Sequence, residues 1–275
     1  MDIVGYSKLP IDKQRDLIEE LTKYVSISES YQSAVSNNAV IALPTGDGMA
    51  LVFLEEPDAP ARCAIEICRL MTEGLRIGRF PLRMGLHGGM VFRIKDINGR
   101  DNVAGAGINI GQRIMDLGDE GHVLCSEKLA DDLQHYSDLA IKLTVLGECE
   151  VKHGVTVSVM NITGRQVGNE QLPVVFAKQV YASLNEYERI IFHQLLGDSH
   201  RTELQLKQAV GEHQAAALAL ERLKDIDLID HYIMADAPAA WSLSARGSHV
   251  AQCNGLRAKT DYRRPIGFGP ETRFG

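Results

Sequence analysis

The spacing of apolar residues in the first half of the chain predicts alternating strands and helices. Leu17, Leu21 and Val25 recur on one helical face, whereas residues 39–43 and 49–53 form short apolar runs that are typical of strands. The predicted elements are, in chain order, strand 2–4, helix 12–25, strands 39–43 and 49–53, a helix from Pro60 to about Arg76, strand 82–86, an extended segment 90–94, a polar connection 95–107, helix 108–117, strand 123–125, a helix from Glu127, and strands 139–146 and 155–161. This β-α-β-β-α-β order predicts an α+β domain of the ferredoxin-like type over residues 1–162.

The second half of the chain changes character after a polar stretch, which we interpret as a linker over residues 163–177. Three helical patterns followed by two short apolar runs predict a small winged-helix-like α/β domain over residues 178–257. The predicted elements are helices 185–196, 201–210 and 212–223 and strands 231–234 and 240–243. Residues 258–275 are rich in Arg, Gly and Pro, which predicts a flexible tail.

The charge of the chain argues against a nucleic-acid partner. The 275 residues carry a net charge of −7, so the whole chain does not favour a polyanion. Within residues 178–257, eight basic and ten acidic residues leave a net charge of −2, and the expected recognition helix presents methyl groups and carboxylates. We therefore interpret this domain as a regulatory or dimer-stabilising module. The basic stretch from Arg257 to Arg264 leaves DNA binding as an alternative.

The sequence predicts neither a membrane span nor export. No apolar run approaches the roughly 20 residues that a spanning helix requires. The segment from Met1 to Gly5 lacks the basic and apolar regions of a signal peptide. The five cysteines include no CxxC pair, which is typical of reduced thiols. We expect a cytoplasmic protein.

Four polar residues in the first half have a pattern that indicates phosphoryl chemistry. Asp2 lies at a predicted strand, Asp47 lies between two glycines at a predicted hairpin tip, and Asn109 and Arg113 are four residues apart on one helix. Two carboxylates brought together bind divalent cations, and two cations can hold the attacking and the leaving oxygen of a displacement. An amide and a guanidinium on one helical face can stabilise charge on a transferring phosphoryl group.

These four residues belong to motifs that follow one another in a known order. The segments are Asp-Ile-Val-Gly-Tyr-Ser at 2–7, Thr-Gly-Asp-Gly-Met at 45–49, Arg-Met-Gly-Leu-His-Gly-Gly at 83–89 and Gly-Ile-Asn-Ile-Gly-Gln-Arg at 107–113. In this order and spacing, residues 1–162 resemble the class III nucleotide cyclase domain. Each motif is common alone, and the resemblance depends on all four together.

The resemblance implies a homodimer in which two copies pair head to tail and form active sites at their interface. It implies two divalent cations, Mg²⁺ or Mn²⁺, that promote attack of the ribose 3′-OH on the α-phosphate of a nucleoside triphosphate. The residues that it implies are Asp2, Asp47 and the carbonyl of Ile3 for the metals, Asn109 for the ribose, Arg113 of the other subunit for the α-phosphoryl transition state, and Lys152 for the triphosphate.

The two positions that read a purine base in this family depart from its pattern. Adenylate cyclases have a Lys where this chain has Leu43 and an Asp or Thr where it has Ala106, and the Glu and Cys of guanylate cyclases are missing as well. Apolar residues at both positions leave a purine without its hydrogen-bond partners. This combination resembles the bacterial pyrimidine cyclases of Pycsar anti-phage systems, whose product activates a separate effector protein. It implies cyclic UMP or cyclic CMP as the product. Between the two substrates we slightly favour UTP, although no residue decides it, and Thr45 and Arg93 are candidate base-reading residues by their place in the chain.

Two alternatives stay open. One is an adenylate cyclase with an unusual base pocket. The other is an inactive regulator with a cyclase fold, which is favoured by the position of Asp2 directly after Met1, where the family's strand begins several residues earlier. A late start codon explains that departure equally well.

Overall fold

The computed structural model describes five stretches of the chain, and they divide into two compact units. The described stretches are residues 1–73, 80–151, 154–197, 200–233 and 238–257. The first unit spans Met1–Phe176 and the second begins at Ala177. The segment predicted as a linker, 163–177, contains the end of one strand and the start of a helix.

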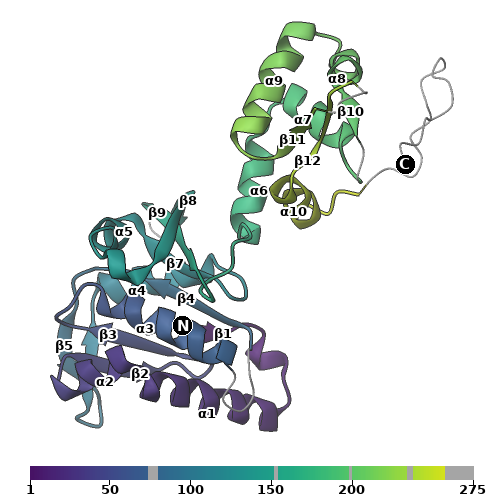
Figure 1. Cartoon of the computed structure of the whole chain (residues 1–275). Coiled ribbons are helices and arrows are strands. Elements are labelled where there is room, and N and C mark those ends of the chain that lie inside the picture. Colours follow the sequence, from purple (N-terminus) through teal and green to yellow (C-terminus); the bar gives the residue numbers. More distant parts are fainter. Residues whose placement is uncertain (74–79, 152–153, 198–199, 234–237, 258–275) are drawn as a thin grey trace. The chain divides into compact units, whose positions relative to one another are not determined.

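A five-stranded sheet of mixed direction forms the first unit (Figure 1). Its order is β1 (Asp2–Ile3), β4 (Leu82–Leu86), β7 (Val123–Ser126), β9 (Val155–Gly164) and β8 (Ile141–Val151). Among the described strand pairs of this sheet, only β4–β7 is parallel. The hairpin of β2 (Val40–Pro44) and β3 (Met49–Phe53) adjoins β1 through an antiparallel bridge between Asp2 and Gly48. The unit is thus α+β, as the sequence predicts.

Three helices pack on one face of this sheet and form the main core. Leu21 and Tyr24 of α1, Ile67 of α3 and Leu129 of α5 belong to one buried cluster with Met84 of β4. Each fully buried aliphatic side chain of this kind stabilises the fold by about 1.5–3 kcal/mol. The helices of the unit are η1 (Tyr6–Lys8), α1 (Ile11–Ile27), α2 (Glu29–Ser36), α3 (Ala59–Glu73), α4 (Ala106–Asp116), α5 (Glu127–Leu133) and η2 (Ser137–Leu139).

Helix α4 packs on the other face of the sheet. Since side chains alternate along a strand, the core-facing Met84 places Arg83 and Gly85 on this opposite face. A Cβ at Gly85 would lie 2.3 Å from the Met115 nitrogen and 2.5 Å from the Gly111 oxygen. Gly85 therefore lets the backbone of α4 lie directly on β4, and the outer face of α4 carries Asn109 and Arg113.

Helix α2 and strand β6 are among the elements that the sequence pattern did not indicate. Helix α2 follows α1 after a one-residue break at Ser28, whose hydroxyl accepts the Tyr31 N–H and caps α2. The polar connection predicted over 95–107 contains strand β6 (Asp101–Ala104), which pairs with β5 (Phe92–Lys95) as a hairpin. Both segments are exposed or short, so neither has a clear apolar period.

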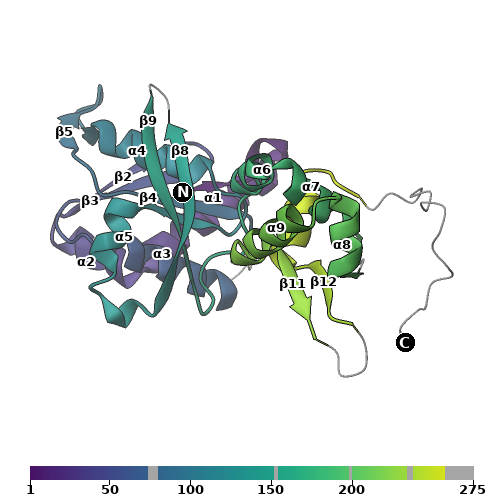
Figure 2. The ribbon, with the colours of Figure 1, turned by 90° about the horizontal axis from the view of Figure 1, so that it is seen from above.

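The second unit contains the three helices and the hairpin that the sequence predicts (Figure 2). Two further helices, α6 and α10, and a short strand, β10, were not predicted; the strand completes a sheet of order β10-β12-β11. Its winged-helix character stays a prediction. Among the described residues, no helix is both long and apolar enough to span a bilayer. The elements are α6 (Val174–Ser183), α7 (Glu186–Gln194), β10 (Arg201–Thr202), α8 (Glu203–Val210), α9 (His213–Asp225), β11 (Ile229–Tyr232), β12 (Ala240–Leu243) and α10 (Ala245–Cys253).

Candidate functional site

The backbones that carry Asp2 and Asp47 lie side by side. The Ile3 N–H donates to the Asp47 carbonyl at 3.0 Å, and Asp2 forms the bridge to Gly48. Asp2 is buried, with 8% of its surface exposed, and Asp47 is half-buried. The structure therefore brings together the two segments that carry the sequence-predicted carboxylates, although they are 45 positions apart in sequence.

The two glycines around Asp47 make this approach sterically possible. Gly46 has a φ of +97°, in the left-handed region that favours glycine. A Cβ at Gly48 would lie 2.2 Å from the Met1 carbonyl oxygen and 2.7 Å from the Asp2 Cα. Since both neighbours are backbone atoms, a larger residue at position 48 would push β1 away from the hairpin.

An arginine holds both carboxylate oxygens of Asp2. Arg83 is the cross-strand neighbour of Asp2, and its Nε donates to Oδ1 at 2.8 Å while its Nη2 donates to Oδ2 at 3.0 Å. The side chains of Asp2 and Arg83 are 12% and 23% exposed. The hydrogen bond to Asp2 raises the pKa of Arg83, so the guanidinium stays charged. The negative charge of Asp2 is thus balanced by an arginine of its own chain.

The same guanidinium reaches the end of α4. Its Nη2 also donates to the Asp116 carboxylate at 3.1 Å, and its Nη1 donates to the carbonyls of Asp116 at 3.3 Å and Gly118 at 3.2 Å. Arg83 therefore ties the candidate metal ligand to the helix that carries Asn109 and Arg113. The motif at 83–89 includes Arg83 but indicates no role for it, and Asp116 lies outside the four motifs. The contacts of these two residues depend on the pairing of β1 with β4 and on the packing of α4 on β4.

Ala106, Asn109 and Arg113 lie on the outer face of α4. Ala106 and Asn109 are exposed and Arg113 is half-buried, whereas Ile114 and Met115 are buried against the sheet. In the described part of the chain, no hydrogen bond or ion pair involves the side chain of Asn109 or Arg113, and none links them to Asp2 or Asp47. One copy therefore presents two separate groups of candidate residues.

The remaining predicted residues are placed as follows. Leu43 is half-buried in β2 opposite Ala50. Thr45 is exposed in the hairpin turn, and Arg93 donates to the Asn38 carbonyl at 3.1 Å. Nothing in these contacts identifies a base-reading role for either residue. Lys152 lies outside the described residues.

The donors around Asp2 suit a divalent cation in kind, although Asp2 is engaged with Arg83. Mg²⁺ is commonly held by one or two carboxylates with phosphate and water oxygens completing its shell. Asp2, Asp47 and the Ile3 carbonyl supply such oxygens. Across the described ranges, no three His, Cys, Asp or Glu side chains are grouped as a metal site. The oxygens of a bound triphosphate would therefore have to supply the remaining ligands.

A cavity of about 270 Å³ lies next to this corner, between β3, β4 and helices α3, α4 and α5. His87 lines it, and its Nδ1 is 2.8 Å from the hydroxyl of Ser126, which caps α5. Burial, followed by the charge of Lys128, lowers the pKa of His87. His87 is therefore neutral near pH 7.

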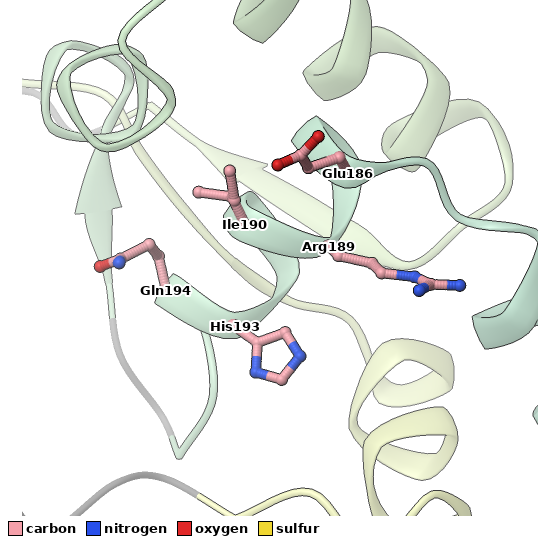
Figure 3. Close-up of a pocket in the computed structure, with 5 residues that line it drawn as sticks. All are labelled: Glu186, Arg189, Ile190, His193 and Gln194. Carbon is pink, nitrogen blue, oxygen red and sulfur yellow. The ribbon is translucent and has the colours of Figure 1, made fainter.

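An open hollow on α7 of the second unit does not resemble a catalytic site (Figure 3). Of its polar residues, Arg189 donates to the Ala182 carbonyl at 2.8 Å, and the Nε2 of His193 lies 2.7 Å from the Tyr181 hydroxyl. The hollow is lined by Glu186, Arg189, Ile190, His193 and Gln194. Arg189 and His193 already have partners in their own unit, so we do not assign this surface a reaction.

Among known proteins, the chain is similar in structure to several solved proteins, and the sequence comparisons found no match. No protein-family model and no curated protein matches the chain. The adenylyl cyclase CyaB from P. aeruginosa is 19% identical, with a TM-score of 0.45, over 60% of this chain and 91% of its own. Adenylate cyclases from Trypanosoma brucei, studied in their monomeric state, are 16% identical, with a TM-score of 0.49, over 62% of this chain and 88% of their own. An adenylate/guanylate cyclase/hydrolase from Silicibacter pomeroyi is 23% identical, with a TM-score of 0.45, over 59% of this chain and 92% of its own. At these values, function has to be argued from the residues of this chain.

Proposed function

We propose that this protein is a nucleotide cyclase, which converts a nucleoside triphosphate into its 3′,5′-cyclic monophosphate and pyrophosphate. The observation that carries the proposal is the close approach of β1 to the Gly46–Gly48 turn, which sets Asp2 beside the hairpin of Asp47. The four motifs around these residues have the order seen in class III cyclase domains. Asn109 and Arg113 add an amide and a guanidinium on an accessible helical face.

Each group then has a defined chemical task. Divalent cations held by Asp2 and Asp47 would lower the pKa of the ribose 3′-OH and neutralise the leaving pyrophosphate. In the reaction, the 3′-oxygen loses its proton and bonds to the α-phosphorus, while the bond from that phosphorus to the β-phosphate oxygen breaks. The amide of Asn109 would orient the ribose, and Arg113 would donate hydrogen bonds to the α-phosphoryl oxygens as their charge develops.

A homodimer would bring these groups together. Asn109 and Arg113 face outward from α4 and have no partner in the described part of their own chain. The segment around the β5–β6 hairpin also presents apolar side chains to solvent, with Met90 89%, Phe92 63% and Ile97 fully exposed. Several exposed apolar residues on one short segment are typical of an interface. We therefore propose that the outer face of α4 in one copy completes the Asp2–Asp47 corner of another.

A pyrimidine nucleotide is the substrate that we propose, with UTP ahead of CTP. Leu43 and Ala106 stand where purine cyclases of the family have polar side chains, so neither can satisfy the hydrogen-bonding edge of a buried purine. By the same resemblance, the cyclic product would act on a separate effector in anti-phage defence.

A second candidate function is an inactive regulator that keeps the cyclase architecture. The pairing of both Asp2 oxygens with Arg83 favours it, because a cation has to compete with that guanidinium. The retention of Asp47, Asn109 and Arg113 favours the enzyme, since a purely structural role requires none of them.

The deciding experiment incubates the purified full chain with Mn²⁺ and ATP, GTP, CTP or UTP in separate reactions. Mass spectrometry identifies the product, Asp47→Ala is the inactive control, and Asp138→Asn, at an exposed aspartate outside the proposed site and interface, is the matched control. Cyclic UMP or cyclic CMP that disappears in Asp47→Ala supports the proposal and identifies the base. Cyclic AMP would contradict the pyrimidine assignment, and the absence of any product would favour the regulator.

A further inference from the structure

One guanidinium is shared by two carboxylates of unequal burial. Arg83 has five N–H donors, and the contacts to Asp2, Asp116 and Gly118 engage all of them. The Asp2 side chain is 12% exposed, whereas that of Asp116 is 52% exposed. We infer that Arg83 is an internal counter-ion that competes with a divalent cation for Asp2, and that Asp116 retains Arg83 when Asp2 is released. The inference rests on the proposed function, which places cations at Asp2.

Competition follows from the geometry of the pair. The guanidinium donates to each oxygen of Asp2, at 2.8 Å and 3.0 Å, in the bidentate arrangement that is strongest for this pair. A cation needs the same oxygens and is repelled by the positive charge beside them. Cation binding at Asp2 therefore requires at least one of these hydrogen bonds to open.

Asp116 makes that opening possible without leaving Arg83 unpaired. Three contacts do not involve Asp2, namely the Asp116 carboxylate at 3.1 Å and the carbonyls of Asp116 and Gly118 at 3.3 Å and 3.2 Å. They hold the guanidinium at the end of α4 and keep its charge balanced. The neighbouring Asp119 attracts Arg83 by its charge but forms no hydrogen bond with it in the described chain; its carboxylate accepts the Val174 N–H at 2.8 Å.

The test measures Mn²⁺ binding to the nucleotide-free full chain, by electron paramagnetic resonance of the free ion. Binding that disappears in Asp47→Asn defines the site. Arg83→Gln is expected to raise the affinity of this site about tenfold, the scale of one hydrogen bond between charged groups. Asp116→Asn is expected to lower it about threefold, because Asp2 is then the only carboxylate within the described residues that accepts a hydrogen bond from Arg83.

The double variant shows whether Asp116→Asn weakens Mn²⁺ binding through Arg83 or only by removing a negative charge near the site. Asp116→Asn removes one negative charge near the site in either background, but it can strengthen the Arg83–Asp2 pair only where Arg83 is present. In Arg83→Gln, the further change Asp116→Asn is therefore expected to alter affinity less than about twofold. Asp138→Asn removes another exposed carboxylate that pairs with an arginine, Arg62, and it is the matched control. Thermal unfolding of each variant shows that it is folded, and Arg83→Lys, which keeps the charge without the fork, is expected to bind with intermediate affinity.

Three results would overturn the inference. Unchanged or weaker Mn²⁺ binding in folded Arg83→Gln contradicts competition, and equal losses from Asp116→Asn in both backgrounds contradict the retaining role. Absence of Asp47-dependent binding in every variant, Arg83→Gln included, removes the metal site and the inference together. The nucleotide assay on the unaltered protein distinguishes these failures, since a cyclic product with unaltered Mn²⁺ binding leaves the cyclase proposal standing and rejects only the role of Arg83.

Discussion

The corner of Asp2 and the outer face of α4 differ in how completely their polar groups are satisfied. Asp2 is buried, and both its oxygens accept hydrogen bonds from Arg83. Asn109 is exposed, Arg113 is half-buried, and neither has a side-chain partner in the described part of the chain. Both regions lie on the α4 side of the same sheet, joined through the contact of Arg83 with Asp116.

Asp2 is fixed by contacts within the fold, whereas Asn109 and Arg113 are available to contact a ligand or another copy. Buried charges require partners in the folded chain, so Asp2 is oriented before any substrate arrives. Exposed side chains keep their rotamer freedom and become ordered only when something binds them. We therefore expect substitutions of the Asp2–Arg83 pair to affect both folding and activity, and substitutions on α4 to affect activity alone.

The largest effect is expected from Asp47→Ala, which removes one of the two candidate metal carboxylates. Loss of cation-assisted charge stabilisation should lower the rate of cyclisation by about 10³-fold or more. Stability should change by less than about 0.5 kcal/mol, because the Asp47 carboxylate accepts no hydrogen bond within the described residues. Initial rates and a urea titration measure the two quantities, and normal activity in the variant would reject Asp47 as a ligand.

Arg113→Ala tests the other region. A guanidinium that acts on the transition state is worth about 10²-fold in rate, so kcat should fall by that amount. Since the Arg113 side chain has no hydrogen-bond or ion-pair partner within the described chain, the unfolding midpoint of the variant should equal that of the unaltered protein. Arg69→Ala, at an exposed position on α3, is the matched control. A clear loss of stability with no loss of rate would show that Arg113 is structural.

Gly48→Ala should separate the two carboxylates without removing either. The new Cβ would lie 2.2 Å from the Met1 oxygen and 2.7 Å from the Asp2 Cα, so β1 has to shift. We expect a loss of about 1–3 kcal/mol in stability, as for other overpacked sites, together with weaker Mn²⁺ binding. Gly88→Ala, where a Cβ meets nothing within 4 Å, is the control. Equal behaviour of the two variants would contradict the close approach of β1 to the hairpin.

The smallest effect concerns the pH dependence of stability. Burial lowers the pKa of His87, so the unfolded chain binds its proton more readily than the folded one. The free energy of unfolding should therefore decrease as the pH falls below the ordinary histidine pKa, about 6.5, and His87→Gln should reduce that slope. Denaturant titrations between pH 7.5 and pH 5 measure it. A steeper slope in the variant would contradict a lowered pKa of His87 in the folded protein.

The sequence predicted the α+β architecture because the apolar periods of its long elements are clear. Helix α1 and the β2–β3 hairpin fall within a few residues of their predicted bounds. Helix α2 and the β5–β6 hairpin were missed because their positions are mostly exposed or polar. A pattern of apolar residues cannot indicate elements that bury few side chains.

The candidate site was predicted as separate residues, and the structure adds the contacts between them. The turn glycines around Asp47 were readable from sequence as a hairpin, but the need for Gly48 depends on the passing backbone of Asp2. The pairing of Asp2 with Arg83 joins positions 81 apart and depends on strand register. Local propensity contains no information on such register, which is fixed by the packing of the whole sheet.

The most direct test of the account mixes two inactive proteins, Asp47→Ala and Arg113→Ala. If a complete site takes its carboxylates from one copy and its arginine from another, random pairing gives half of the dimers one intact site, and activity should return to about one quarter of the unaltered level. Size-exclusion chromatography establishes that both variants form dimers and exchange subunits. Recovery near one quarter supports a site shared between copies. No recovery from freely exchanging dimers would contradict it and place the function of this chain outside a shared catalytic site.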